Sequence, residues 1–168
     1  MKFFSTLSIL AFLFLFTAEG FAQNKLIILV RHAEKAVMES DENPDPELSA
    51  AGKERAERFK KVIGKYRPGA FYSTDYRRTR ETIRPLAEKR HKEIKIYDPQ
   101  NPRALVDEIM ASKTKRFVVA GHSNTIPGLA NLIGQKELFR NLTESEFGAI
   151  YLIRIKDGRI KHIKILPY

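Results

Sequence analysis

Apolar and polar residues alternate along the chain in blocks that predict strands and helices in turn. Residues 25–30 are apolar after the opening lysine, and such an unbroken run is typical of a strand buried on both faces. The segments 70–73, 93–98 and 116–121 predict three more strands. Near the end of the chain, Asp157-Gly158 separates two alternating runs and predicts a hairpin.

Helical periodicity occupies the gaps between the predicted strands. The segment 36–47 is acidic and contains two prolines, so we expect a loop there. Ser49 is then expected to cap a helix that reaches about Tyr66. The apolar stripe of this helix, at spacings of three and four, comprises Gly52, Ala56, Phe59, Ile63 and Tyr66.

The later helices complete an alternating order of elements. Thr74 or Asp75 is expected to cap a helix that ends near Arg90. Two shorter helices are expected at 102–111 and 125–133. Strand and helix thus alternate four times before the hairpin. This order predicts an α/β fold of three layers, with a mostly parallel sheet, helices on both faces and a C-terminal β-hairpin.

The first 22 residues have the pattern of a secretory signal peptide. Lys2 gives a positive start, residues 3–16 are almost wholly apolar, and small residues precede Gln23. The apolar run is short for a membrane span, although an uncleaved N-terminal anchor is the alternative. We therefore expect cleavage after Ala22, leaving one exported domain at 23–168 that is periplasmic or secreted and has no membrane span.

Composition narrows the chemistry. The chain has no cysteine, which excludes disulfides, cysteine zinc sites and thiol nucleophiles. Its formal net charge is +10, which favours contact with phosphates and other polyanions. The basic residues are spread along the chain, so a solvated basic surface is favoured over a nucleic-acid-binding face. No helix or strand has an apolar seam that would indicate an oligomer.

Polar residues follow the strands of the predicted sheet at the edge where ligands bind in such folds. Arg31 and His32 follow the first strand, a helix carrying Arg78 follows the second, and His122 follows the fourth. Arginine forks match phosphate oxygens, and a histidine beside arginines stays neutral and can attack phosphorus. The other two histidines, His91 and His162, stand beside lysines and are expected to be solvent-exposed.

Four ordered segments resemble motifs of the histidine phosphatase superfamily, whose best-known branch is phosphoglycerate mutase-like. They are "VRHAEK" at 30–35, "LSAAGKERA" at 48–56, "YSTDYRRTRET" at 72–82 and "VVAGHSNT" at 118–125. The resemblance implies that His32 is the nucleophile and that Arg31 binds phosphate. It implies a second phosphate-binding arginine in Arg78 and a second pocket histidine in His122.

The sequence departs from the family pattern in informative ways. Ala33 follows the first histidine where glycine is usual, and Met38 stands where many mutase-like members have an asparagine. The segment between the second arginine and second histidine also lacks the insertions of mutases. The family's general acid has no clear match, and Glu34, Asp45 and Asp98 are candidates by position only.

The resemblance implies a small phosphatase that needs no metal or cofactor. Its expected substrate is a small phosphomonoester, a protein phosphohistidine or a phosphorylated component of the cell envelope, and we expect no nucleic-acid partner. Two alternatives stay open. One is a non-catalytic module that binds phosphorylated envelope polymers, and the other is a phosphosugar mutase.

Overall fold

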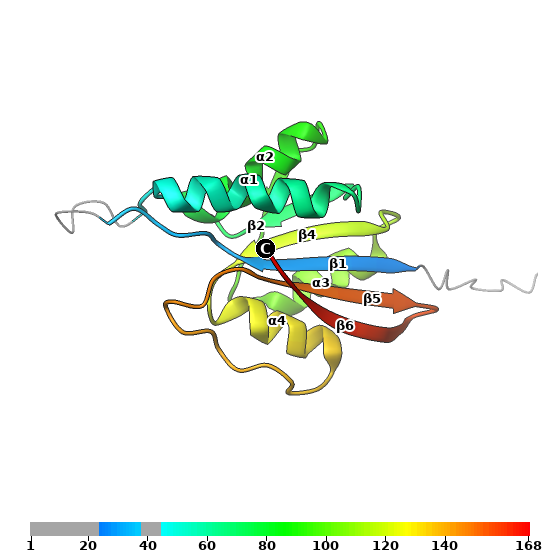
Figure 1. The fold of residues 1–168 in the computed structure, drawn as a ribbon. Coiled ribbons are helices and arrows are strands. Elements are labelled where there is room, and N and C mark those ends of the chain that lie inside the picture. Colours follow the sequence, from blue (N-terminus) through cyan, green and yellow to red (C-terminus); the bar gives the residue numbers. More distant parts are fainter. Residues whose placement is uncertain (1–23, 38–44) are drawn as a thin grey trace, which may run out of the picture.

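The structure is a computed structural model that describes residues 24–37 and 45–168 (Figure 1). The predicted signal peptide and Met38 lie outside the described residues. The described strands form a six-stranded sheet of order β3-β2-β4-β1-β5-β6. The strands are β1 (Lys25–Arg31), β2 (Ala70–Ser73), β3 (Ile94–Ile96), β4 (Arg116–Gly121), β5 (Ala149–Lys156) and β6 (Arg159–Pro167). The helices are α1 (Ala50–Gly64), α2 (Arg77–Lys89), α3 (Pro102–Ala111) and α4 (Thr125–Gly134).

β1 is one of the two central strands of the sheet. It pairs in parallel with β4 and antiparallel with β5, while β2 pairs in parallel with both β4 and β3. β5 and β6 form the predicted hairpin, and both turn residues have positive φ, 52° at Asp157 and 71° at Gly158. A glycine at the second of these positions adopts that φ without a steric penalty. The predicted fold class is therefore confirmed.

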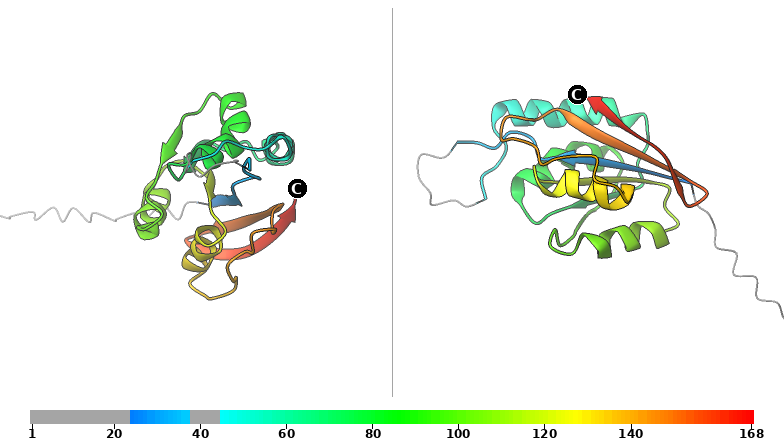
Figure 2. Two further views of the ribbon diagram at one scale, coloured as in Figure 1. Left: turned by 90° about the vertical axis from the view of Figure 1, so that its left-hand side faces the viewer. Right: turned by 90° about the horizontal axis from the view of Figure 1, so that it is seen from below.

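Helices cover both faces of the sheet. Figure 1 places α1 and α2 above the sheet and α4 below it, and the left-hand view in Figure 2 shows the same separation. Leu26, Ile28 and Val30 of β1 pack in one core cluster with residues of α1 and α2. Ile27 and Leu29 belong to the second cluster, with residues of α3 and α4. The unbroken apolar run of β1 is explained by this two-sided burial.

The start of α1 agrees with the prediction, whereas the start of α2 differs from it. Ser49 caps α1 as expected, its hydroxyl accepting from the Gly52 amide. The prediction that Thr74 or Asp75 caps α2 was wrong, because the N-cap residue of α2 is Tyr76, whose side chain makes no capping hydrogen bond. Thr74 instead forms a hydrogen bond with His122, which follows β4. Asp75 forms an ion pair with Arg80.

The third strand is also shorter than expected, since β3 covers only Ile94–Ile96 of the predicted 93–98. It lies at the edge of the sheet and pairs with β2 alone.

No helix within the described residues is long and apolar enough to cross a membrane.

Candidate active site

The four site residues predicted from the strand ends line one cavity. Arg31 and His32 come from the end of β1, Arg78 from the first turn of α2, and His122 follows β4. The cavity has a volume of about 480 Å³. It lies at the carboxyl edge of the parallel strands, where ligands bind in folds of this kind. The geometry brings together the residues that the sequence singled out, and their chemical roles remain predictions.

His32 is buried, and its hydrogen bond defines the tautomer. Its Nδ1 lies 2.8 Å from the carbonyl oxygen of Ala33. A carbonyl oxygen can only accept, so Nδ1 carries the proton and Nε2 keeps its lone pair. The pKa of His32 is lowered to about 4, mainly by burial and partly by the positive charges of Arg78 and Arg31, while the hydrogen bond to Ala33 acts in the opposite direction. The ring is therefore neutral near pH 7.

Neighbouring elements fix the backbone of the residues around His32. The His32 amide donates to the carbonyl of Gly121 in β4 at 2.8 Å. The next amide, that of Ala33, donates to the hydroxyl of Thr82 in α2, also at 2.8 Å. A Cβ at Gly52 would stand only 2.2 Å from the carbonyl oxygen of Glu34, so glycine lets α1 pack against this segment. β4, α2 and α1 thus fix the backbone from which the imidazole of His32 projects.

His122 faces His32 across the cavity. The two ring centroids are 5.4 Å apart at an angle of 66°. Nε2 of His122 lies 2.9 Å from the hydroxyl of Thr74, and the Tyr76 ring meets the imidazole edge-on at 5.0 Å. Burial lowers the pKa of His122 to about 4, helped by the charges of Arg78 and Arg31. Both imidazoles are therefore neutral in the unliganded protein.

Arg31 is buried and anchors a distant segment of the chain. Its Nη1 donates to the carbonyl oxygens of Thr143 at 2.6 Å and Glu146 at 2.9 Å. Its Nη2 lies 3.3 Å from a carboxylate oxygen of Glu144, and its guanidinium covers the ring of Phe147 at 4.1 Å. The 143–147 segment therefore fixes this cation at the cavity wall.

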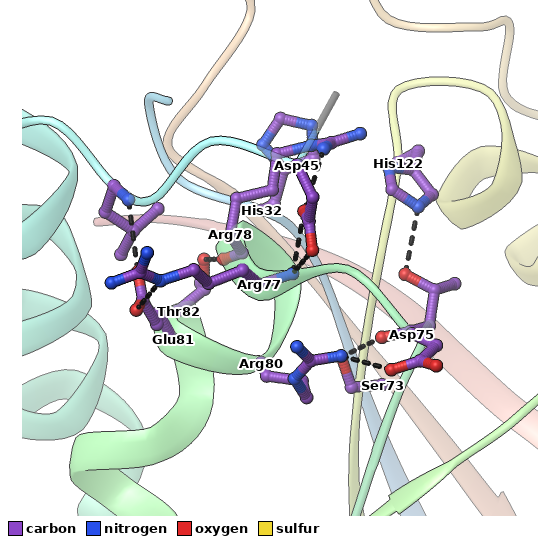
Figure 3. Close-up of polar contacts among 12 residues, drawn as sticks. His32, Asp45, Ser73, Asp75, Arg77, Arg78, Arg80, Glu81, Thr82 and His122 are labelled. Carbon is purple, nitrogen blue, oxygen red and sulfur yellow. Dashed lines mark hydrogen bonds and ion pairs between the residues drawn. The ribbon is translucent and has the colours of Figure 1, made fainter. Parts of the chain in front are cut away.

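Three arginines at the start of α2 have different partners, as Figure 3 shows. Arg77 pairs with Glu81 at 3.0 Å, and Arg80 pairs with Asp75. Arg78 lines the cavity, where its guanidinium lies 4.4 Å from the Tyr76 ring centroid and 3.4 Å from Asp45. Of the three, only Arg78 lines the cavity.

The three candidate acids have different surroundings. Glu34 forms an ion pair with Arg55 at 2.6 Å, which lowers the pKa of its carboxyl through hydrogen bonding. Asp98 accepts a hydrogen bond from the Gln100 amide in a turn. Neither of these two carboxylates lines the cavity.

Asp45 is the candidate acid that lies beside the site. Both of its carboxylate oxygens accept from the Arg77 amide, at 2.9 and 2.8 Å, so this side chain caps α2 from the preceding loop. It also contacts Arg78. The structure therefore places one of the three candidates against Arg78, in a position that a helix cap explains.

Sequence reasoning missed several residues of the cavity wall. Tyr76 lies inside a quoted motif and could have been found there, because it directly precedes the arginine helix. Glu144, which also lines the cavity, lies in a segment without periodicity or motif. The remaining polar lining includes Lys35, Gln100, Ser123 and Asn124. Across residues 24–37 and 45–168, no group of three or more His, Asp or Glu side chains could hold a metal ion.

Comparison with known proteins agrees with this geometry. The family model of the histidine phosphatase superfamily (branch 1) matches residues 27–99, which contain His32 and Arg78. No curated protein gives a significant match.

Solved structures with the same fold include several phosphatases. A chain from Agrobacterium tumefaciens, provisionally assigned as the phosphohistidine phosphatase SixA, is 18% identical with a TM-score of 0.64, over 86% of this chain and 99% of that one. Mycobacterial glucosyl-3-phosphoglycerate phosphatase is 14% identical with a TM-score of 0.65, over 87% and 99%. A phosphoserine phosphatase from Entamoeba histolytica, in complex with 3-phosphoglyceric acid, is 14% identical with a TM-score of 0.62, over 83% and 96%. At these identities the likeness establishes a shared fold.

Proposed function

Since residues 27–99 match the family model of the histidine phosphatase superfamily, we propose that this chain is a phosphatase of that superfamily whose reaction passes through a phosphohistidine on His32. One observation carries the proposal. The Nδ1 proton of His32 is committed to the Ala33 carbonyl, so Nε2 is the ring nitrogen with a lone pair. This neutral nucleophile lines a cavity together with two arginines and a second histidine. A cavity that only bound anions would need the arginines but not this tautomer.

The first step forms a covalent intermediate. The Nε2 lone pair of His32 attacks phosphorus, and the bond between phosphorus and the ester oxygen breaks. Arg78 and Arg31 stabilise the charge on the phosphoryl oxygens during transfer, and His122 contacts the same group. The leaving oxygen takes a proton from an acid, for which we propose Glu144 because its carboxyl lines the cavity.

The second step regenerates the enzyme. Water attacks phosphorus, its proton passes to the Glu144 carboxylate, and the bond between phosphorus and Nε2 breaks. Inorganic phosphate is released and the ring recovers its lone pair. In this scheme the guanidinium groups supply the positive charge that a metal ion supplies in other phosphatases, so we propose that no metal is needed.

The proposed substrate is a small phosphomonoester or a phosphoryl group on a protein histidine. The cavity of about 480 Å³ and its polar lining suit a compact phosphorylated group. The names of the structural neighbours, which include a phosphohistidine phosphatase and a glucosyl-3-phosphoglycerate phosphatase, support both classes.

We also propose export of the protein, which would make phosphorylated envelope components accessible to it. The support is the charged start, apolar run and small residues before Gln23. Mass analysis of protein recovered from the cell envelope should find Gln23 as the first residue. Recovery of the intact chain from cytosol would contradict this part of the proposal.

The decisive experiment is a rapid quench with a labelled phosphomonoester, followed by peptide mapping. Label should be found on the peptide that contains His32, survive alkali and be lost in acid, as expected for a phosphoramidate bond. It should be absent in His32→Ala, present in the exposed control His162→Ala, and insensitive to chelators. If substrates are turned over without this label, or if no phosphate ester in a broad panel is hydrolysed, the proposed mechanism is wrong.

A further inference from the structure

A second cavity lies at the opposite end of the sheet from the His32 site. It has a volume of about 410 Å³ and is formed where β1 and β4 begin, β5 ends and α1 ends. The two cavities are at opposite ends of β1, a seven-residue strand, so roughly 20 Å separates them at about 3.3 Å per residue. The cationic side chains used in the argument below are Lys65, Lys115, Arg116, Arg154 and Lys156.

Strand register brings two of these cations together. Leu26 of β1 pairs with Arg116 of β4 on one side and with Arg154 of β5 on the other. Residues directly opposite one another in a sheet project on the same face, so the two arginines flank Leu26. Leu26 belongs to the core cluster under α1, which defines that face. Lys156 follows two positions after Arg154 and returns to the same face.

The five cations used in this argument have no acidic partner in the described part of the chain. No carboxylate lines the cavity, and none of the five cations forms an ion pair with a residue in 24–37 or 45–168. Arg116 donates to the carbonyl of Tyr66, just beyond the end of α1, at 3.0 Å. A helix C-terminus carries only about half a negative charge. It therefore accounts for one of these cations and not for five.

We propose that this cavity binds a compact polyanion, a ligand that carries two or more phosphate groups. Its volume suits a small molecule, and its floor includes the buried side chain of Leu26. Cations drawn from separate elements into one concave site match a compact ligand. A nucleic-acid face would instead present its basic residues as a stripe along a groove or helix. The site is independent of the phosphatase chemistry at His32.

The test uses the purified protein and sodium tripolyphosphate, followed by titration calorimetry at low and moderate salt. All variants carry His32→Ala, so that the ligand is not hydrolysed. Arg154→Gln with Lys156→Gln is the test pair, because these exposed side chains make no hydrogen bond or ion pair in the described chain. Arg84→Gln with Lys92→Gln removes the same charge at exposed positions outside the cavity.

The test pair should weaken tripolyphosphate binding at least tenfold, while the control pair changes it less than twofold. Added salt should weaken the binding of the parent more than that of the test pair. Equal effects of the two pairs would show a diffuse charge effect and overturn the proposal, as would tripolyphosphate binding only in the His32 cavity. If anionic vesicles or duplex DNA, but not tripolyphosphate, depended on Arg154 and Lys156, the proposed ligand class would be wrong.

Discussion

At the scale of single residues, neighbouring arginines of α2 differ in the side chains that they contact. Arg77 is tied to Glu81, and Arg80 to Asp75, whereas Arg78 lines the His32 cavity. We expect Arg78→Ala to lower kcat/KM by about 10²–10³-fold, as does loss of one preorganised donor to a transition state. Arg77→Ala and Arg80→Ala are the matched controls in steady-state assays. A larger loss in either control would show that the assignment is displaced along the helix.

The general acid is the second question at this scale. Asp45 is held by the Arg77 amide and Arg78, whereas the Glu144 side chain is 90% exposed and, among the described residues, has one polar contact, with Arg31. Glu144 can therefore turn toward a leaving group. We expect Glu144→Gln to slow hydrolysis of an alkyl phosphate at least tenfold more than that of p-nitrophenyl phosphate, which needs no proton on its leaving group.

The comparison variant is Asp45→Asn, which should affect both substrates by the same factor, because it perturbs Arg78 and the start of α2. The rates are measured with both esters under single-turnover conditions. A leaving-group dependence in Asp45→Asn and not in Glu144→Gln would reverse the assignment.

At the scale of elements, one hydroxyl joins α2 to the segment that carries His32. Thr82 accepts from the Ala33 amide and donates to the carbonyl of Arg78, both at 2.8 Å. Thr82→Val leaves a buried amide unpaired, so we expect the free energy of unfolding to fall by about 1–3 kcal/mol. Turnover should fall as well, because the imidazole loses its support. Urea unfolding and steady-state kinetics measure the two effects.

The same helix offers a matched control one turn earlier. Thr79 is fully buried like Thr82, but its hydroxyl has no hydrogen-bond partner in the described part of the chain. Thr79→Val should therefore be neutral or stabilising, since it removes an unsatisfied polar atom. Equal destabilisation by both substitutions would mean that packing, and not the bond to Ala33, makes Thr82 important.

The positions of the strand ends could be predicted from the sequence, but the contacts made by loops could not. The strand ends were predictable because apolar runs mark buried strands, and parallel strands deliver Arg31 and His122 to one edge. Asp45 as the cap of α2 was not predictable, because a loop with no periodicity carries it to the helix. The contact of Arg31 with Thr143 joins residues 112 positions apart. No local pattern in the sequence encodes such a long-range contact, so Glu144 was missed.

At the scale of the whole molecule, the neutral histidine links the site to stability. The folded-state pKa of His32 is about 4, while an unfolded chain has about 6.5. Between these values the unfolded state binds more protons than the folded state. The contribution of His32 to stability is therefore fully present above pH 6.5 and is lost as the pH falls toward 4. A group this buried contributes on the order of 3 kcal/mol over that window.

Chemical unfolding at several pH values tests this linkage. His32→Gln removes the titrating ring, so its free energy of unfolding should change less than that of the parent between pH 6.5 and pH 4. His162→Gln, at an exposed position of β6, should keep the slope of the parent. Identical slopes in all three proteins would show that His32 is not neutral in the fold.

The order of strands in the sheet has a consequence for how the molecule is assembled. β1 emerges first from the ribosome among the described strands, yet both of its partners, β4 and β5, are made long after it. Lys25 at its start bonds to Thr114, 89 residues later, and Arg31 at its end bonds to Thr143, 112 residues later. Contacts of such separation require large loops to close before they yield any stabilisation, which slows folding. The strand that carries the nucleophile is thus synthesised early but enclosed late, so a nascent chain that has not yet reached β5 contains His32 without the walls of its cavity.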